Sequence, residues 1–372
     1  MRFNHVFLFA LTAVFLFACT QVSDADKTVK IGFVGALTGD GASFGISSQE
    51  GAQMAVEEIN VAGGIHGTPL QIIYEDGRCS AEGSNTATQK LVTVDRVQAI
   101  IYGSCDGEFS AAAPFLEQNK VIGIATYPSS PDITNYGDYL FRNSYNDAIS
   151  GRVLAEDMIH HYKKLAMISE LNTYSQALKQ ALRKEFEERG GIIVADEDFQ
   201  AEMRDFRTTL LKIFNQKPDV IFVNPDTPVT GSALLRQLKE LSNTKPLYSN
   251  FFLSGDTGRE SSGEAAEGVV FIADPDPNGK QADALFEKYR ERYGKNPAFP
   301  YPFSASYDAV YLLTSAIREK GYDATAIKEW LYSLPEYDGT LGKYHFDENG
   351  DEIGIQVELR VVKNGRAEKI KF

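Results

Sequence analysis

The chain has 372 residues, 43% of them hydrophobic and 24% charged, a composition typical of a globular protein with enough residues for two domains of ordinary size. Its 51 acidic and 37 basic residues give a formal net charge of -14. This excess of acid argues against nucleic acid and against an anionic membrane surface as direct partners, because both are recognised by clustered Lys and Arg.

The N-terminus has the organisation of an export signal. Arg2 and His5 precede an almost unbroken apolar run over residues 6–18. A bilayer span needs about 20 apolar residues, so this run is too short to cross a membrane comfortably. A basic start, a short apolar stretch and a small residue at its end predict a signal peptide over residues 1–18.

The residues at the end of the apolar run, Leu16-Phe17-Ala18-Cys19, resemble the lipobox of bacterial lipoproteins. In those proteins the Cys is acylated and becomes the first residue of the mature chain. The resemblance implies lipidation of Cys19, a tether over residues 19–27, and a place in the periplasm or at the cell surface on a bacterial membrane. A plain signal peptide with an incidental Cys, or an uncleaved anchor, is the alternative.

From residue 29 the chain alternates apolar runs with amphipathic segments. Residues 29–37, 69–76, 97–103 and 120–126 are predicted strands, and helices are predicted over 47–62, 81–95 and around 111–118. In the first helix, Ser47 or Ser48 is the expected N-cap, and Gly63-Gly64 ends the helix. Strands that alternate with helices in this way indicate a parallel sheet with helices on both faces.

The alternation stops over residues 131–144 and then restarts as a second block. Its predicted strands are 165–169, 191–199, 218–224, 245–250 and 268–273, and its predicted helices are 147–162, 174–189, 206–215 and 231–241. Helices over 281–293, 304–319 and 324–332 follow, and the tail predicts β-hairpins around 348–351 and 363–365. The fold class is therefore α/β with two Rossmann-like lobes, and a ligand is expected at the carboxyl ends of the strands.

Cys79 and Cys105 follow the predicted strands 69–76 and 97–103. Adjacent parallel strands would bring these two positions together. With Cys19 acylated, they are also an even pair in an oxidising compartment. We expect a disulfide between them; two buried free thiols are the alternative.

The turn Gly103-Ser104-Cys105-Asp106-Gly107 lies between a strand and a helix, which is the context of a nucleophile elbow. A Cys hydrolase would need a His base. The candidates are His66, His160, His161 and His345, and none lies in an identifying motif. We favour a ligand-binding turn whose Cys is bridged, and hence no enzyme.

No segment predicts a cofactor or a metal. The glycine-rich stretch 35–45 lacks the spacing and the Lys of a phosphate-binding loop. His160 and His161 are adjacent on a predicted helix, so their side chains point in different directions. The segment 274–279 contains prolines and lacks the last Glu of a calcium loop, so it is interpreted as a linker.

The opening of the mature chain, residues 29–76, resembles the branched-chain-amino-acid-binding proteins. These are type I periplasmic binding proteins, the receptors of ABC importers. Further matches follow in order: LRQL at 235–238, AEGVV at 266–270, ASYDAV at 305–310 and YHFDENGD at 344–351. The resemblance therefore covers nearly all of the mature chain.

The resemblance implies a monomer whose two lobes are joined by three crossings, near residues 142–143, 271–272 and 339–341. Lobe I is then 28–142 with 272–340, and lobe II is 143–271 with 341–372. Hinge closure over a small polar ligand, an amino acid or a related amide or carboxylate, would produce the form that docks on a permease. A sensory receptor of the same fold is the alternative function.

The resemblance also implies the ligand contacts, carried over residue by residue. They are Phe44, Ser104, Cys105, Asp106, Tyr127, Ser129, Tyr174, Asp226 and Phe251. Asp106 stands where the family often has Ser, at the start of a helix whose N–H groups could hold a carboxylate, which Asp106 would repel. The family's ammonium-binding acid falls at the uncharged Phe251. The ammonium site is therefore altered or moved, with Asp106 or Asp226 as candidates.

Overall fold

The computed structural model describes residues 28–370. The predicted signal peptide, Cys19 and the tether lie outside these residues. Within 28–370, none of the helices combines the length and the apolar character that a membrane span requires.

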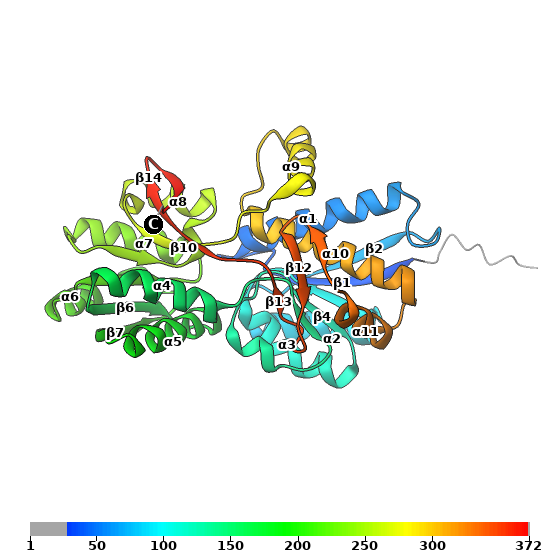
Figure 1. Cartoon of the computed structure of the whole chain (residues 1–372), viewed down its shortest axis with the longest axis horizontal. Coiled ribbons are helices and arrows are strands. Elements are labelled where there is room, and N and C mark those ends of the chain that lie inside the picture. The colour runs from blue at the N-terminus through cyan, green and yellow to red at the C-terminus, as the bar shows by residue number, and fades with distance from the viewer. Residues whose placement is uncertain (1–27, 371–372) are drawn as a thin grey trace, which may run out of the picture.

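The protein has two α/β lobes that lie side by side (Figure 1). The elements of the first lobe are β1 (Val29–Gly35), α1 (Ala42–Val61), β2 (Leu70–Asp76), α2 (Ala81–Thr93), β3 (Ala99–Tyr102), α3 (Asp106–Asn119), β4 (Ile122–Ala125), β5 (Leu140–Arg142), α9 (Gly279–Tyr293), α10 (Pro300–Lys320), α11 (Ala324–Ser333), β11 (Tyr337–Gly339), β12 (Gly342–Phe346) and β13 (Glu352–Ile353). Its main sheet has the strand order β2-β1-β3-β4-β5, and all pairs are parallel.

The second lobe repeats this strand order and extends it. Its elements are α4 (Asp147–His161), β6 (Lys164–Glu170), α5 (Thr173–Glu188), β7 (Ile192–Phe199), α6 (Arg207–Asn215), β8 (Val220–Asn224), α7 (Pro228–Glu240), β9 (Leu247–Ser249), α8 (Asp256–Ser262), β10 (Val270–Ala273), β14 (Glu358–Lys363) and β15 (Arg366–Lys369). The sheet order is β15-β14-β10-β9-β8-β6-β7; the pairs β10–β14 and β14–β15 are antiparallel, and the other pairs are parallel. The predicted fold class is confirmed.

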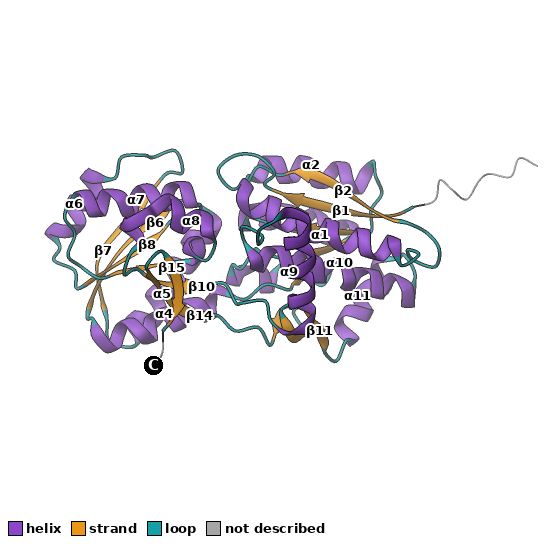
Figure 2. Ribbon diagram, turned by 90° about the horizontal axis from the view of Figure 1, so that it is seen from above, coloured by secondary structure: helices purple, strands orange, loops and turns teal. Residues whose placement is uncertain are grey.

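Helices cover both faces of each sheet (Figure 2), because the central strands are buried on both sides. In the first lobe, α1 and α10 pack together on one face, and α2 and α3 pack together on the other. In the second lobe, α4 and α5 form one layer, while α6 and α7 contribute to a separate core on the other face. Because helices cover both faces of each sheet, polar groups that could contact a ligand lie in the loops at the ends of the strands.

Helix α1 begins earlier than the apolar periodicity indicates. Helix α1 begins at Ala42 after Gly41, so Ser47 and Ser48 lie inside the helix and do not cap it. Their hydroxyls are used in other contacts, since Ser48 Oγ donates to the carbonyl of Gly103 at 2.5 Å. Helix α3 begins at Asp106, the helix start expected there, and it includes the 111–118 segment.

The chain crosses between the lobes three times, and two crossings lie later than expected. The first follows β5 as expected, but β10 pairs entirely within the second sheet, so the second crossing follows Ala273 rather than 271. The third follows Ile353 rather than 341, and Figure 1 shows it as the long red stretch between β13 and β14. Residues 342–353 stay with the first lobe because Phe346 packs on Phe141, with ring centroids 5.3 Å apart.

Helices α1 and α10 approach each other closely at Gly51. A Cβ atom at this position would lie 1.9 Å from the carbonyl oxygen of Phe303. No side chain can occupy that space unless the two helices move apart.

We expect Gly51→Ala to lower the free energy of unfolding by about 1–3 kcal/mol, because the clash outweighs the better helix propensity of Ala. Gln53→Ala, on the exposed face of the same helix, is the control and should change it by no more than about 0.5 kcal/mol. Urea unfolding of both variants measures the effect. A Gly51→Ala protein as stable as the parent would show that the helices are not this close.

Candidate functional site

The structure brings all nine expected contact residues around one cavity between the lobes. They are Phe44, Ser104, Cys105, Asp106, Tyr127, Ser129, Tyr174, Asp226 and Phe251. Their role in ligand binding stays a prediction, but their meeting in one place follows from the topology. Each lies in the segment after a strand, where the carboxyl ends of parallel strands share one edge of a sheet.

The cavity is closed in this structure. Its volume is about 10 Å³, about the space that one water molecule needs. Elsewhere between the lobes, Arg204 of the second lobe forms an ion pair with Asp40 of the first at 2.9 Å. The lobes must therefore separate to admit a larger molecule.

Four aromatic rings form the apolar part of the wall. Phe44 and Tyr127 come from the first lobe, and Tyr174 and Phe251 from the second. Phe251 is the centre of the group, with ring-centroid distances of 5.6 Å to Phe44, 5.1 Å to Tyr127 and 4.9 Å to Tyr174. The uncharged residue at the expected ammonium site thus joins the lobes by aromatic contact.

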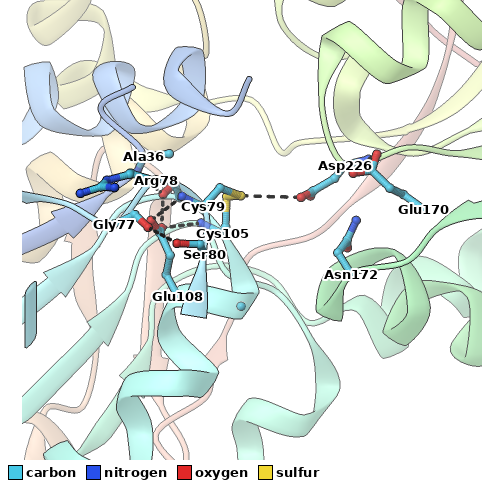
Figure 3. The surroundings of a disulfide bond; sticks show 12 residues. Ala36, Gly77, Arg78, Cys79, Ser80, Cys105, Glu108, Glu170, Asn172 and Asp226 are labelled. Atoms are coloured by element: carbon cyan, nitrogen blue, oxygen red, sulfur yellow. Dashed lines mark hydrogen bonds between the residues drawn. A yellow bond between two sulfur atoms is a disulfide. The ribbon is translucent and has the colours of Figure 1, made fainter. Parts of the chain in front are cut away.

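The disulfide expected between Cys79 and Cys105 is present in the structure and forms part of the wall, with a Cα–Cα distance of 5.3 Å (Figure 3). The buried carboxylate of Glu108 accepts from the backbone N–H of Cys79 at 2.9 Å and of Cys105 at 3.2 Å. It also accepts from the Ser104 hydroxyl. Because the Cys105 sulfur is bonded to Cys79, the nucleophile that a hydrolase would need is absent.

Asp106 uses its carboxylate within the first lobe. Its Oδ1 accepts from the backbone N–H of Ser129 at 3.0 Å and of Ser130 at 2.6 Å. Burial raises the pKa of Asp106 to about 6, so the group is mostly ionised at neutral pH. The Ser129 hydroxyl donates to Asp147 at 2.6 Å, and burial raises the pKa of Asp147 to about 7.

Asp226 extends from the second lobe toward the disulfide (Figure 3). Its Oδ2 lies 3.7 Å from Cys79 Sγ. A disulfide sulfur carries no hydrogen, so this contact donates no hydrogen bond to the carboxylate. The backbone N–H of Asp226 donates to Glu170 Oε2 at 2.9 Å. Burial, and then the charge of Glu170, raise the pKa of Asp226 well above its ordinary value.

One carboxylate oxygen and two sulfurs, from Asp226, Cys79 and Cys105, lie within 4.8 Å of one another. Thiolates bind metals, but both sulfurs here are in the disulfide. This group therefore does not fit a metal.

Sequence reasoning missed four acids around the cavity: Glu108, Asp147, Glu170 and Asp274. Glu108 follows Cys105 by three residues, the spacing of a capping box, and this signal was available. Asp274 was interpreted as part of a linker. In the structure it is buried at the second crossing and accepts from the hydroxyls of Tyr145 at 2.8 Å and Tyr127 at 3.3 Å.

The chain matches the family model of periplasmic binding proteins over residues 28–365. An amino acid binding protein of Pseudomonas aeruginosa is 29% identical over 333 residues, which are 87% of each chain. The substrate binding protein LivJ of Streptococcus pneumoniae, in complex with isoleucine, has a TM-score of 0.83 at 26% identity and covers 92% of this chain and 98% of its own. A solute binding protein from R. palustris, in complex with benzoate, has a TM-score of 0.82 at 18% identity, covers 92% and 96%, and shows likeness of fold alone. The expected resemblance is confirmed.

The buried Asp274 predicts a pH dependence of stability. Burial raises its pKa to about 7, whereas in the unfolded chain the group titrates near about 4. Between these values the folded state binds more protons, so the free energy of unfolding falls as the pH rises, by up to about 1.4 kcal/mol per pH unit. Asp274→Asn keeps an acceptor for Tyr145 and removes this titration.

The melting temperature of Asp274→Asn relative to the parent should therefore increase from pH 5 to pH 8. Differential scanning calorimetry across that range measures the difference. Asp283→Asn, on the exposed face of α9, is the charge-matched control and should show a constant difference. A constant difference for Asp274→Asn as well would contradict the prediction.

Proposed function

Since the chain belongs to the periplasmic binding protein family, we propose that it is an extracytoplasmic receptor of an ABC importer. It captures a small polar ligand between its lobes and delivers it to the permease in the closed form. This function is binding without catalysis, which agrees with a Cys105 held in a disulfide.

The observation that carries the proposal is the Tyr174 hydroxyl. Tyr174 is 4% exposed and lines the cavity, and its Oη has no hydrogen-bond partner among the described residues. A buried hydroxyl without a partner costs free energy, and such groups are rare in folded proteins unless something else satisfies them. A polar ligand held in the cavity would supply the partner.

The arrangement of the lobes supports the same function. The cavity walls come from both lobes, and the contact across it depends on a few side chains such as Phe251 and Asp226. Opening of the lobes exposes polar groups, and closure surrounds a ligand with fixed partners while excluding water. An amino acid or a related amide or carboxylate has the size and polarity for such a site.

Tyr174→Phe removes only the hydroxyl and should weaken ligand binding by roughly fivefold to a hundredfold, the equivalent of about 1–3 kcal/mol. A thermal-shift screen of amino acids, amides, aromatic acids and polyamines supplies the ligand, and calorimetric titration measures its affinity. Tyr293→Phe, an exposed tyrosine on α9, is the control. Equal affinity of Tyr174→Phe and the parent would place the ligand elsewhere.

We further propose that the chain is exported and anchored by a lipid on Cys19, on the strength of the Leu16-Phe17-Ala18-Cys19 run. Cys19→Ala should then move the protein from the detergent phase to the aqueous phase in a partitioning assay, because the acyl chains hold it in the membrane. Thr20→Ala leaves the acylated residue intact and should stay in the detergent phase. Unchanged partitioning of Cys19→Ala would contradict lipidation.

A further inference from the structure

The cavity has acidic groups on both of its walls. Asp106 belongs to the first lobe and Asp226 to the second, and no Lys or Arg is among the residues that line the cavity. Glu170 lies directly behind Asp226 and accepts from its backbone N–H and from the Thr230 hydroxyl. Among the described residues, no donor forms a hydrogen bond to the Asp226 carboxylate, which lies against the sulfur of Cys79 in the disulfide.

Arg142 and Arg204 act on the charges of Asp106 and Glu170, and both are engaged with other groups. Arg142 is fully buried and donates to the carbonyls of Ser129 and Ser130, and its guanidinium pairs with Asp351 at 2.6 Å. Arg204 pairs with Asp40 of the first lobe. Neither is in hydrogen-bond contact with Asp226, and no Lys or Arg among residues 28–370 forms an ion pair with its carboxylate, so a cationic ligand could serve as its partner.

The donors of Ser129 and Ser130 that could hold an anion are taken. The backbone N–H groups of Ser129 and Ser130 point to the same oxygen of Asp106, and the Ser129 hydroxyl donates to Asp147. An incoming carboxylate would find these donors occupied and would lie beside the ionised Asp106, which repels it. The Asp106 carboxylate thus occupies the backbone N–H groups of Ser129 and Ser130, where the carboxylate of a ligand could otherwise bind.

The remaining wall suits an organic cation. Phe44, Tyr127, Tyr174 and Phe251 give the cavity aromatic rings from both lobes, and such rings attract ammonium groups. The unpartnered Tyr174 hydroxyl is buried at the same cavity and can accept a hydrogen bond from an N–H or O–H group.

We propose that this cavity selects a small organic cation that carries no free carboxylate, with Asp226 as the counter-ion. The inference rests on the receptor function proposed above and narrows its ligand from polar molecules in general to protonated amines, amino amides and alkylated ammonium ions. Asp226 determines specificity and Tyr174 completes the hydrogen bonding.

The test compares cations that have no carboxylate with related molecules that carry one. Leucinamide is compared with leucine and with 4-methylpentanoate, and choline is compared with glycine betaine, by calorimetric titration of the mature protein. At least one of the two cations should bind, and should do so at least tenfold more tightly than its carboxylate-bearing counterpart. This comparison needs no variant and cannot be confused with misfolding.

Asp226→Asn keeps the shape of the side chain and removes its charge. It should weaken binding of the preferred cation at least tenfold without lowering the melting temperature, whereas Asp283→Asn should not change the affinity. Unchanged affinity of Asp226→Asn would overturn the role of Asp226. Binding of leucine, 4-methylpentanoate or glycine betaine as tight as that of the matching cation would overturn the ligand class and leave the receptor function standing. If no cation, zwitterion or carboxylate in the wider screen binds, both the proposed ligand class and the proposed receptor function are overturned.

Discussion

A single buried guanidinium, that of Arg142, holds together the parts of the chain on which the site depends. It ends β5 at the first crossing, donates to the carbonyls of Ser129 and Ser130, and pairs with Asp351 in the segment that precedes the third crossing. A buried charge is tolerated only where it is paired and hydrogen-bonded. The same loop then offers its N–H groups to Asp106. The position of the loop at Ser129 and Ser130, which lies against the cavity, therefore depends on the hydrogen bonds that this loop accepts from Arg142.

Several acidic side chains lie around the cavity, and each has a different role because each has different hydrogen-bond partners. The carboxylate of Glu108 accepts three hydrogen bonds, two of them from the backbone N–H groups of the disulfide cysteines. It therefore stabilises the backbone on both sides of the disulfide. Asp106 is paired with amides of its own lobe. Asp226 has neither kind of partner, and closure of the lobes takes it out of water, where an ionised carboxylate is costly without a positive neighbour. Closure therefore makes the cavity discriminate by charge.

The sequence predicted the repeating strands and helices because they depend on local periodicity, and nearly all of them lie within a few residues of their expected places. It also predicted the cavity residues, since the family resemblance and the strand ends point to the same loops. The alternating apolar and polar residues of the C-terminal tail predicted the hairpin of β12 and β13. They did not predict that this hairpin stays with the first lobe, because that placement depends on the non-local contact of Phe346 with Phe141. The pairing of Asp106 with the amides of 129 and 130 is non-local in the same way and has no signature in the spacing of residues.

The ion pair between Arg204 and Asp40 has a consequence for the behaviour of the unliganded protein. Both side chains are about half exposed, and a pair in that setting stabilises by only about 0–1 kcal/mol and is weakened further by salt. So small a contribution cannot hold the lobes shut by itself. A ligand that contacts both lobes then shifts the populations of the open and closed forms by its preference for the closed one. This ion pair can therefore break and form again at little cost in free energy, and the selectivity of the protein resides in the residues that line the cavity.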